Sequence, residues 1–279
     1  MYEIPISIKK AADKYEPITV GDHTLFPISV KQYDLFVSCE KALGFMAQTL
    51  PVRYLSTPLL KAFYEIDMEA LAKQETVTGL FFSTLLALSL ALRLAPDGEL
   101  KDVMEKWSVS VDKDTGDFKS VCYVDPNSGK TKQITATQYQ KLRYIIAAQN
   151  GVEIPSENVN PELVQAEIDL AQNNAPKLEI NINDQISALC LLTNKEERDI
   201  DDWPILKFER RCQSLQRMLD YVICGVGETQ GTKWKGGNPH PHPYYRKKKN
   251  SSAMAPLENF AGGNGVRAIN NAGGTPANV

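Results

Sequence analysis

The most hydrophobic stretch of the chain reads LFFSTLLALSLALRLA and covers residues 80–95. A membrane-spanning helix needs about 20 predominantly apolar residues. This stretch is shorter, contains Arg93, and has neither a basic flank before it nor aromatic residues at both ends. It predicts a helix buried in the protein core, with a membrane span as the alternative. We expect this helix to be the centre of the fold.

Helical patterns lie on both sides of this stretch. The clearest covers residues 135–151, where Thr135 can cap the first turn and Asn150-Gly151 provides the usual left-handed stop. Elsewhere, apolar residues at spacings of three and four predict further helices. The other expected helices run from Val30 to Leu50, from Pro58 through Met68, from Pro161 to Asn173, from Gln185 to Leu192 and from Leu206 to Cys224.

Two segments have the alternating pattern of strands. The first thirty residues predict an extended chain, in which Gly21-Asp22-His23 forms a hairpin turn. Residues 107–111, 118–124 and 131–134 alternate and are separated by turn sequences, which predicts a three-stranded meander. The expected fold class is therefore α+β and predominantly α-helical, with an N-terminal β-hairpin, an inserted three-stranded β-meander and a disordered basic C-terminal tail.

The chain divides into four expected parts. Residues 1–104 form the hairpin and helical core, 105–134 the meander, 135–231 a helical part and 232–279 the tail. The tail is rich in glycine, proline and basic residues, a composition that cannot bury enough apolar surface to fold. Its seven basic residues and single acid give it a charge of +6, which leaves −9 on residues 1–231 of a chain whose net charge is −3. An acidic body with a basic arm favours partner binding over catalysis.

The last predicted helix carries an apolar stripe. We interpret this stripe as core, with a partner-binding face as the alternative. Its members are Phe208, Cys212, Leu215, Met218, Leu219, Val222 and Ile223.

A search for catalytic, cofactor or metal sites finds none that we predict. Asp112, Asp114 and Asp117 resemble a calcium loop, but the required glycine and glutamate positions hold Asp117 and Tyr123. His240 and His242 have no further ligands nearby in sequence. Residues 225–231 are glycine-rich but lack the GK[ST] ending of a phosphate loop, which predicts a flexible helix exit. We therefore expect no catalytic residue, no cofactor and no enzymatic activity.

The tail contains the one predicted interaction site. It combines aromatic rings with cations, a combination that suits either nucleic acid or an acidic protein surface. The acidic body and the pI near 5.8 disfavour nucleic acid. We therefore predict that a protein partner binds these residues, which are Tyr244, Tyr245, Arg246, Lys247, Lys248 and Lys249.

Compartment signals are indirect. The five cysteines are scattered and never form a CxxC, which disfavours disulfides and zinc and suits a reducing cytoplasm. The first residues lack the charged and apolar regions of a signal peptide. We expect a cytoplasmic protein without a membrane segment.

One helix and the order of the parts resemble a known family. The segment Ile145-Ile146-Ala147-Ala148-Gln149-Asn150-Gly151 lies between an opening hairpin and a later Asp202-Trp203-Pro204, and a basic glycine-rich end follows. Over residues 15–231 this arrangement resembles bacteriophage tail assembly chaperones. The resemblance implies a non-enzymatic protein of the host cytoplasm that binds the tape-measure protein and helps recruit tail-tube subunits. The alternative is a structural component of the phage tail or baseplate. No functional residue is carried over.

Overall fold

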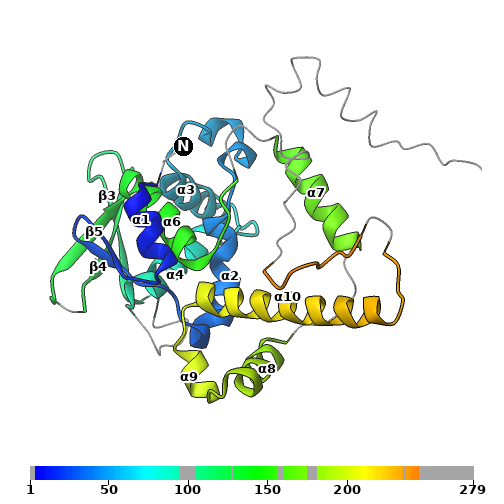
Figure 1. Cartoon of the computed structure of the whole chain (residues 1–279). Coiled ribbons are helices and arrows are strands. Elements are labelled where there is room, and N and C mark those ends of the chain that lie inside the picture. The colour runs from blue at the N-terminus through cyan, green and yellow to red at the C-terminus, as the bar shows by residue number, and fades with distance from the viewer. Residues whose placement is uncertain are drawn as a thin grey trace, which may run out of the picture.

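The computed structural model describes residues 4–94, 103, 105–126, 128–155, 160–174, 181–234 and 237–244. Figure 1 shows a mainly helical body that carries two small sheets and from which one long helix extends. The expected α+β, predominantly helical fold class is confirmed, with its hairpin and meander. In the described ranges the α-helices are α1 (Ile6–Asp13), α2 (Tyr33–Leu43), α3 (Leu59–Ala72), α4 (Leu80–Leu92), α6 (Ala136–Asn150), α7 (Pro161–Asn174), α8 (Ile182–Thr193), α9 (Glu197–Asp201) and α10 (Ile205–Thr229).

Helix α4 lies at the centre of the core, as predicted from residues 80–95. Its residues from Ser83 to Leu92 are all buried, and Leu88 is fully inaccessible to solvent. Helices α2 and α3 pack against it. None of the helices in the described part of the chain is both long and apolar enough to cross a membrane.

The first turn of α4 is held by a buried carboxylate from α3. Asp67 accepts hydrogen bonds from the backbone N–H groups of Thr78, Gly79 and Phe81, and from the Thr78 hydroxyl at 2.7 Å. These N–H groups belong to the start of a helix, where no backbone partner exists. One side chain therefore both caps α4 and joins it to α3.

The strands match the predicted segments closely. β1 (Ile18–Val20) and β2 (His23–Leu25) form an antiparallel hairpin around Gly21, whose φ of 59° suits glycine. β3 (Trp107–Val111), β4 (Phe118–Val124) and β5 (Thr131–Thr135) form an antiparallel sheet with β4 in the middle. Because side chains alternate across a strand, Val121 and Tyr123 of β4 point into the main core.

Helix α6 begins and ends as predicted, and its last residues join the hairpin to the core. Thr135 and Gln138 form a capping box at its start. At its end, the buried Asn150 accepts from the Ile28 backbone N–H at 2.9 Å, while Gln149 donates to the carbonyls of Glu16 and Leu25. The Gln149-Asn150 pair that contributes to the family resemblance thus has a structural role in this chain.

Several helices differ from the predictions. The helix expected from Val30 to Leu50 is shorter, because α2 covers Tyr33–Leu43 and ends at Gly44, and residues 30–32 and 47–49 form separate 3-10 turns. The extended N-terminal segment is wrong over residues 6–13, which form α1, because Ala12 packs into the core and its neighbours Lys9, Lys10 and Ala11 favour helix. The flexible exit predicted at residues 225–231 is also wrong in its first half, since α10 continues to Thr229. The acidic residues before that helix form the separate short helix α9, which the sequence patterns did not predict.

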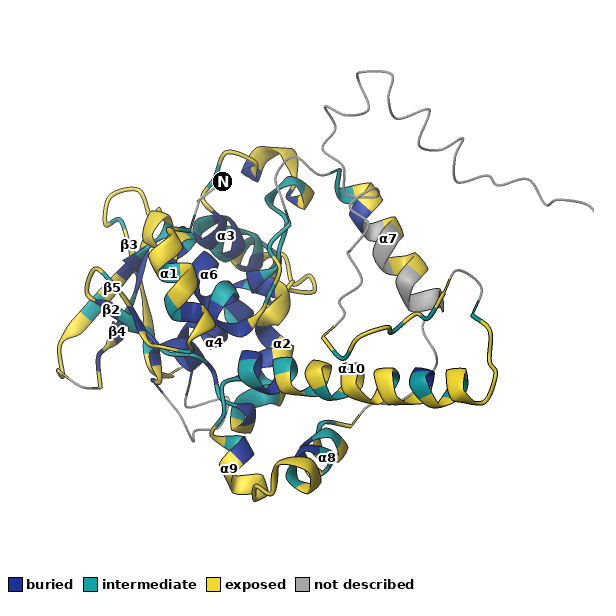
Figure 2. Cartoon of the chain, viewed as in Figure 1, coloured by how far each residue is buried: buried dark blue, intermediate teal, exposed yellow. Residues whose placement is uncertain are grey.

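Two apolar clusters of different size organise the body. The main one runs from Ala12 to Ile205 and includes α2, α3, α4, α6 and the meander. A smaller one forms where α8, α9 and residues 30–32 meet the first turns of α10 around Phe208. Figure 2 shows the buried residues concentrated in the body and most of α10 exposed. Helix α6, from the predicted third part of the chain, therefore shares a core with the first part and the meander.

Candidate functional site

The most distinctive surface of the described chain is the second half of α10. The first half is anchored: the Ile205 backbone N–H donates to the Ile28 carbonyl at 2.9 Å, and Arg210 pairs with Asp13 at 2.6 Å. Phe208 is 1% exposed, and Cys212 and Leu215 pack against the same small cluster. Beyond Leu215 no such cover exists among the described residues of the apolar stripe.

Five large apolar side chains of this second half are roughly half exposed. Met218, Leu219, Val222, Ile223 and Val226 are exposed by 48, 47, 53, 64 and 50%. We call these five residues the exposed α10 face. The interpretation of the whole stripe as core is therefore wrong beyond Leu215, where these side chains are exposed to solvent. Contiguous exposed apolar side chains of this kind mark interaction surfaces.

The chain after α10 folds back along the other side of the helix. At the turn, Gly231 has a φ of 85° and the Thr232 backbone N–H donates to the Gly227 carbonyl at 2.9 Å. Further on, Trp234 lies against Gly227, and His240 Nε2 is 3.9 Å from Asp220 Oδ2. We call residues 232–234 and 237–244 the returning segment.

The returning segment leaves the exposed α10 face uncovered. Its contacts, Gly227 and Asp220, lie seven residues apart and therefore share one side of the helix, with the 6% exposed Cys224 between them. Leu219, Val222 and Val226 point to the other side. The predicted tail therefore begins with a segment packed on α10, which was not predicted because residues 232–244 have no apolar periodicity.

The predicted interaction site falls almost entirely outside the described residues. Tyr244 is described: its side chain is 80% exposed, its ring lies 5.3 Å from that of His242, and its backbone N–H donates to His242 Nδ1. Tyr245, Arg246 and Lys247–Lys249 lie outside the described residues. Tyr244 is therefore the one predicted binding residue that the described part of the chain contains, and it is exposed to solvent.

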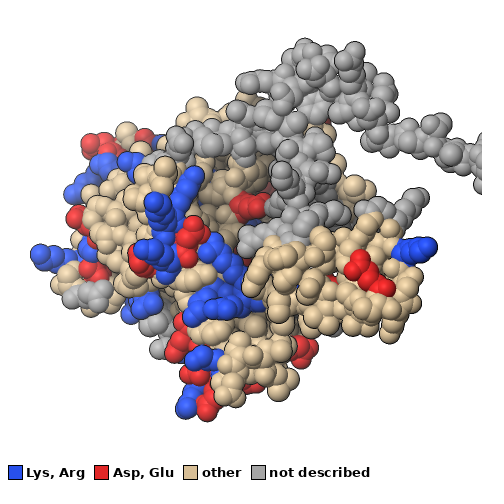
Figure 3. All heavy atoms as spheres, in the orientation of Figure 1, with Lys and Arg blue, Asp and Glu red and all other residues tan. Residues whose placement is uncertain are grey.

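Charge is sparse around the exposed α10 face. Asp220 is the only Asp, Glu, Lys or Arg between Met218 and Gly227. Figure 3 shows a largely uncharged surface over this half of α10, while Lys and Arg gather over α1 and the start of α10. A partner at this face would therefore be recognised mainly by apolar contact and shape.

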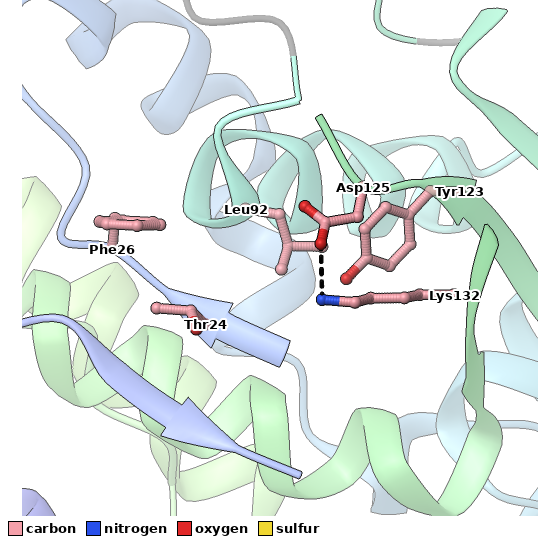
Figure 4. A pocket seen from close by; sticks show the side chains of 6 residues that line it. All are labelled: Thr24, Phe26, Leu92, Tyr123, Asp125 and Lys132. Atoms are coloured by element: carbon pink, nitrogen blue, oxygen red, sulfur yellow. Dashed lines mark ion pairs between the residues drawn. The ribbon is translucent and has the colours of Figure 1, made fainter. Parts of the chain in front are cut away.

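A small polar pocket of about 190 Å³ lies between the hairpin, the end of α4 and the meander (Figure 4). Thr24, Phe26, Leu92, Tyr123, Asp125 and Lys132 line it. Lys132 Nζ is 2.8 Å from Asp125 Oδ2 and donates to the Asp22 carbonyl at 2.6 Å. Its charged groups thus neutralise each other and tie the meander to the hairpin turn.

His23 lies beside this pocket and also joins the hairpin to the meander. His23 Nδ1 is 2.8 Å from the Tyr123 hydroxyl, and the histidine is 4% exposed. Burial raises the pKa of Tyr123, so its phenol stays protonated and is a poor nucleophile. The sequence places His23 only next to the hairpin turn, because its partner Tyr123 lies a hundred residues away along the chain.

We expect His23 to make stability depend on pH. Burial, with help from Lys132, lowers the pKa of His23 below its usual value of about 6.5. The folded state then binds the proton less readily than the unfolded state, so stability falls as pH drops through 6.5 towards the lowered pKa. The free energy of unfolding changes by at most about 1.4 kcal/mol per pH unit through this one group.

Urea unfolding at pH 7.5, 6.5 and 5.5 measures this effect. The wild type should lose more stability over this range than His23→Gln, which cannot titrate. Burial raises the pKa values of Glu40 and Glu209, so these two groups make stability rise as pH falls. Their effect is the same in both proteins and cancels in the comparison. Parallel pH curves for the two proteins would contradict the prediction.

The described residues offer little other chemistry. No group of three His, Cys, Asp or Glu side chains within them is placed to hold a metal ion. All five cysteines are free thiols, and burial raises the pKa of Cys39 to about 12. Because the thiolate is the reactive form, Cys39 is a poor nucleophile.

Comparison with known proteins yields no family model, no curated protein and no solved structure that matches this chain.

Proposed function

We propose that this protein is a phage tail assembly chaperone. It binds an apolar helix of the tape-measure protein on the exposed α10 face, helps recruit tail-tube subunits, and performs no catalysis. The observation that carries the proposal is the exposure of Met218, Leu219, Val222, Ile223 and Val226 on a helix that extends from a well-packed body. The resemblance of residues 134–151 and of the order of the parts supplies the phage context.

The spacing of the exposed residues indicates the shape of the client. Leu219, Val222 and Val226 follow one another at three and four residues, the pattern by which helices pack together. A second helix laid along α10 would cover all five side chains at once. Shielding such a helix in the client would keep an aggregation-prone segment in solution until assembly.

The exposed α10 face and the arm that follows the returning segment offer different interactions. The exposed α10 face is apolar, whereas the arm beyond Tyr244 begins with Tyr245, Arg246 and Lys247–Lys249. The returning segment leads into this arm, and its His240 lies 3.9 Å from Asp220 of α10. A client on the apolar face and an acidic partner on the arm would therefore lie close together, which suits a recruiting role.

Co-expression with the tape-measure protein from the same genome tests the proposal. We expect a soluble complex by affinity pull-down, and we expect Val222→Asp to weaken it by about tenfold or more, since a central apolar contact is replaced by a charge. Val222 is already 53% exposed, so the variant should fold. The matched control is Gln213→Asp, an exposed position on the polar side of the same helix.

Two results would overturn the proposal. One is the absence of a complex with any tail protein. The other is the presence of stoichiometric amounts of this chain in purified mature particles, because a chaperone leaves the particle. That second result would establish the alternative, a structural component of the tail or baseplate.

A further inference from the structure

The apolar positions of α10 form one continuous heptad series. Spacings of three and four residues alternate along the whole helix, as in helices that pair with other helices. The series consists of Ile205, Phe208, Cys212, Leu215, Leu219, Val222 and Val226. The small cluster with α8 and α9 covers its first half, and its second half is exposed.

The positions that flank the exposed half carry no charge. They are Gln216, Met218, Ile223 and Gly225. In paired helices, charges at these positions select the partner and repel wrong ones. Their absence here means that nothing in this half of α10 opposes pairing with an identical helix.

We propose that in the free protein the exposed α10 face pairs with the same face of a second copy, in antiparallel orientation about a two-fold axis. In this register Leu219 packs against the partner's Val222, and Val226 packs against the accessible part of the partner's Leu215, which the small cluster buries only partly. The two-fold symmetry repeats each contact, so that one surface is used twice.

A glycine gives this register its shape complementarity. A Cβ added at Gly225 would meet nothing within 4 Å, so the surface is open there. In the antiparallel pair, Met218 lies opposite the partner's Gly225. The long side chain of Met218, itself 48% exposed, fills the space that the missing side chain leaves.

The position of the body selects the antiparallel orientation. The first half of α10 is joined to the body, whereas the second half extends away from it (Figure 1). Parallel helices would also have to pair along their first halves, where α8 and α9 already cover the apolar series in each copy. Antiparallel helices place the two bodies at opposite ends, and the returning segment on the other side of α10 obstructs neither copy.

The contact covers only about three helical turns, which predicts a weak dimer in the micromolar range. The dimer would occupy the face assigned above to the client, so the two exclude each other. The homodimer follows from α10 alone, but its role as a cover that the client displaces rests on the proposed function.

Analytical ultracentrifugation of the full chain tests the inference. We expect the weight-average mass to rise from 31.1 kDa towards twice that value as the concentration increases. Val222→Asp should remain monomeric at every concentration, whereas Gln213→Asp should behave as the wild type. A wild type that stays monomeric throughout, or a Val222→Asp variant that dimerises normally, would reject the interface.

Exchanging the large and the small side chain between positions 218 and 225 tests the register. Gly225→Met should weaken the dimer by about tenfold or more, because two methionines would then compete for one space. Its melting temperature should not fall, since the added side chain meets nothing within its own copy. Adding Met218→Ala to Gly225→Met should restore dimerisation. Unchanged dimerisation of Gly225→Met, or failure of the double variant to recover, would reject this register.

The same proteins separate this inference from the proposed function. A tape-measure complex without any homodimer rejects only the homodimer. A homodimer that binds no tail protein rejects only the chaperone function.

Discussion

Leu88→Asp is expected to leave the protein largely unfolded at room temperature. Leu88 is fully inaccessible to solvent in the middle of α4, and its neighbours Ala87 and Leu86 are buried as well. An ionised carboxylate there would have no partner, and burying such a group costs several kcal/mol. Since small proteins are stable by only about 5–15 kcal/mol, this loss removes most of the stability.

Circular dichroism and urea unfolding measure the effect. Val37→Asp is the matched control, because Val37 lies on α2, which packs on α4, but is itself 49% exposed. The urea concentration at which the control unfolds should be close to that of the wild type. If Leu88→Asp kept the wild-type unfolding midpoint, α4 would not be the buried centre of the fold.

The second large effect is expected at Asp67. Replacement by alanine leaves three backbone N–H groups and the Thr78 hydroxyl without their acceptor, at a helix start where Phe81 is buried and Gly79 is partly buried. Each buried donor without a partner costs about 1–3 kcal/mol, although water can satisfy some of them. We expect Asp67→Ala to destabilise the protein by about 3 kcal/mol or more.

Hydrogen exchange shows whether the loss arises at this cap. The amides of Thr78, Gly79 and Phe81 should lose protection in Asp67→Ala before the rest of α4 does. Glu69→Ala, on the same helix, removes ion pairs with the exposed Arg53 and Lys73 and a hydrogen bond from the Tyr54 hydroxyl, and should cost less than Asp67→Ala because solvent screens exposed pairs. Equal losses in the two variants would contradict the special role of Asp67.

Local sequence signals predicted most of the elements. The alternation in residues 107–111 and 118–124 and the turn residues between them located the strands of the meander, because both signals are contained within a few residues. Thr135 and Gly151 fixed the ends of α6 in the same way. α1 was missed because the helix propensity of Lys9, Lys10 and Ala11 is a weak signal, and the packing of Ala12 on the core decides for helix over an extended chain.

The candidate site could be predicted only in part. The apolar stripe of α10 is visible in the sequence, but a stripe shows that one side of a helix is apolar and does not show what lies against it. The glycines at 225 and 227 indicated an early end to the helix, yet α10 continues through both, with Trp234 packed on Gly227. That extension adds Val226 to the exposed α10 face.

The sequence by itself determined where most of the helices and strands lie and that α4 is buried, since composition, alternation and capping act over short distances. Only the tertiary structure decided that the stripe of α10 is covered up to Leu215 and open beyond it. The physical reason is length: α8 has 12 residues and α9 has 5, and they meet only the first turns of a helix of 25 residues. The apolar side chains that these short helices do not reach are the ones available to a partner.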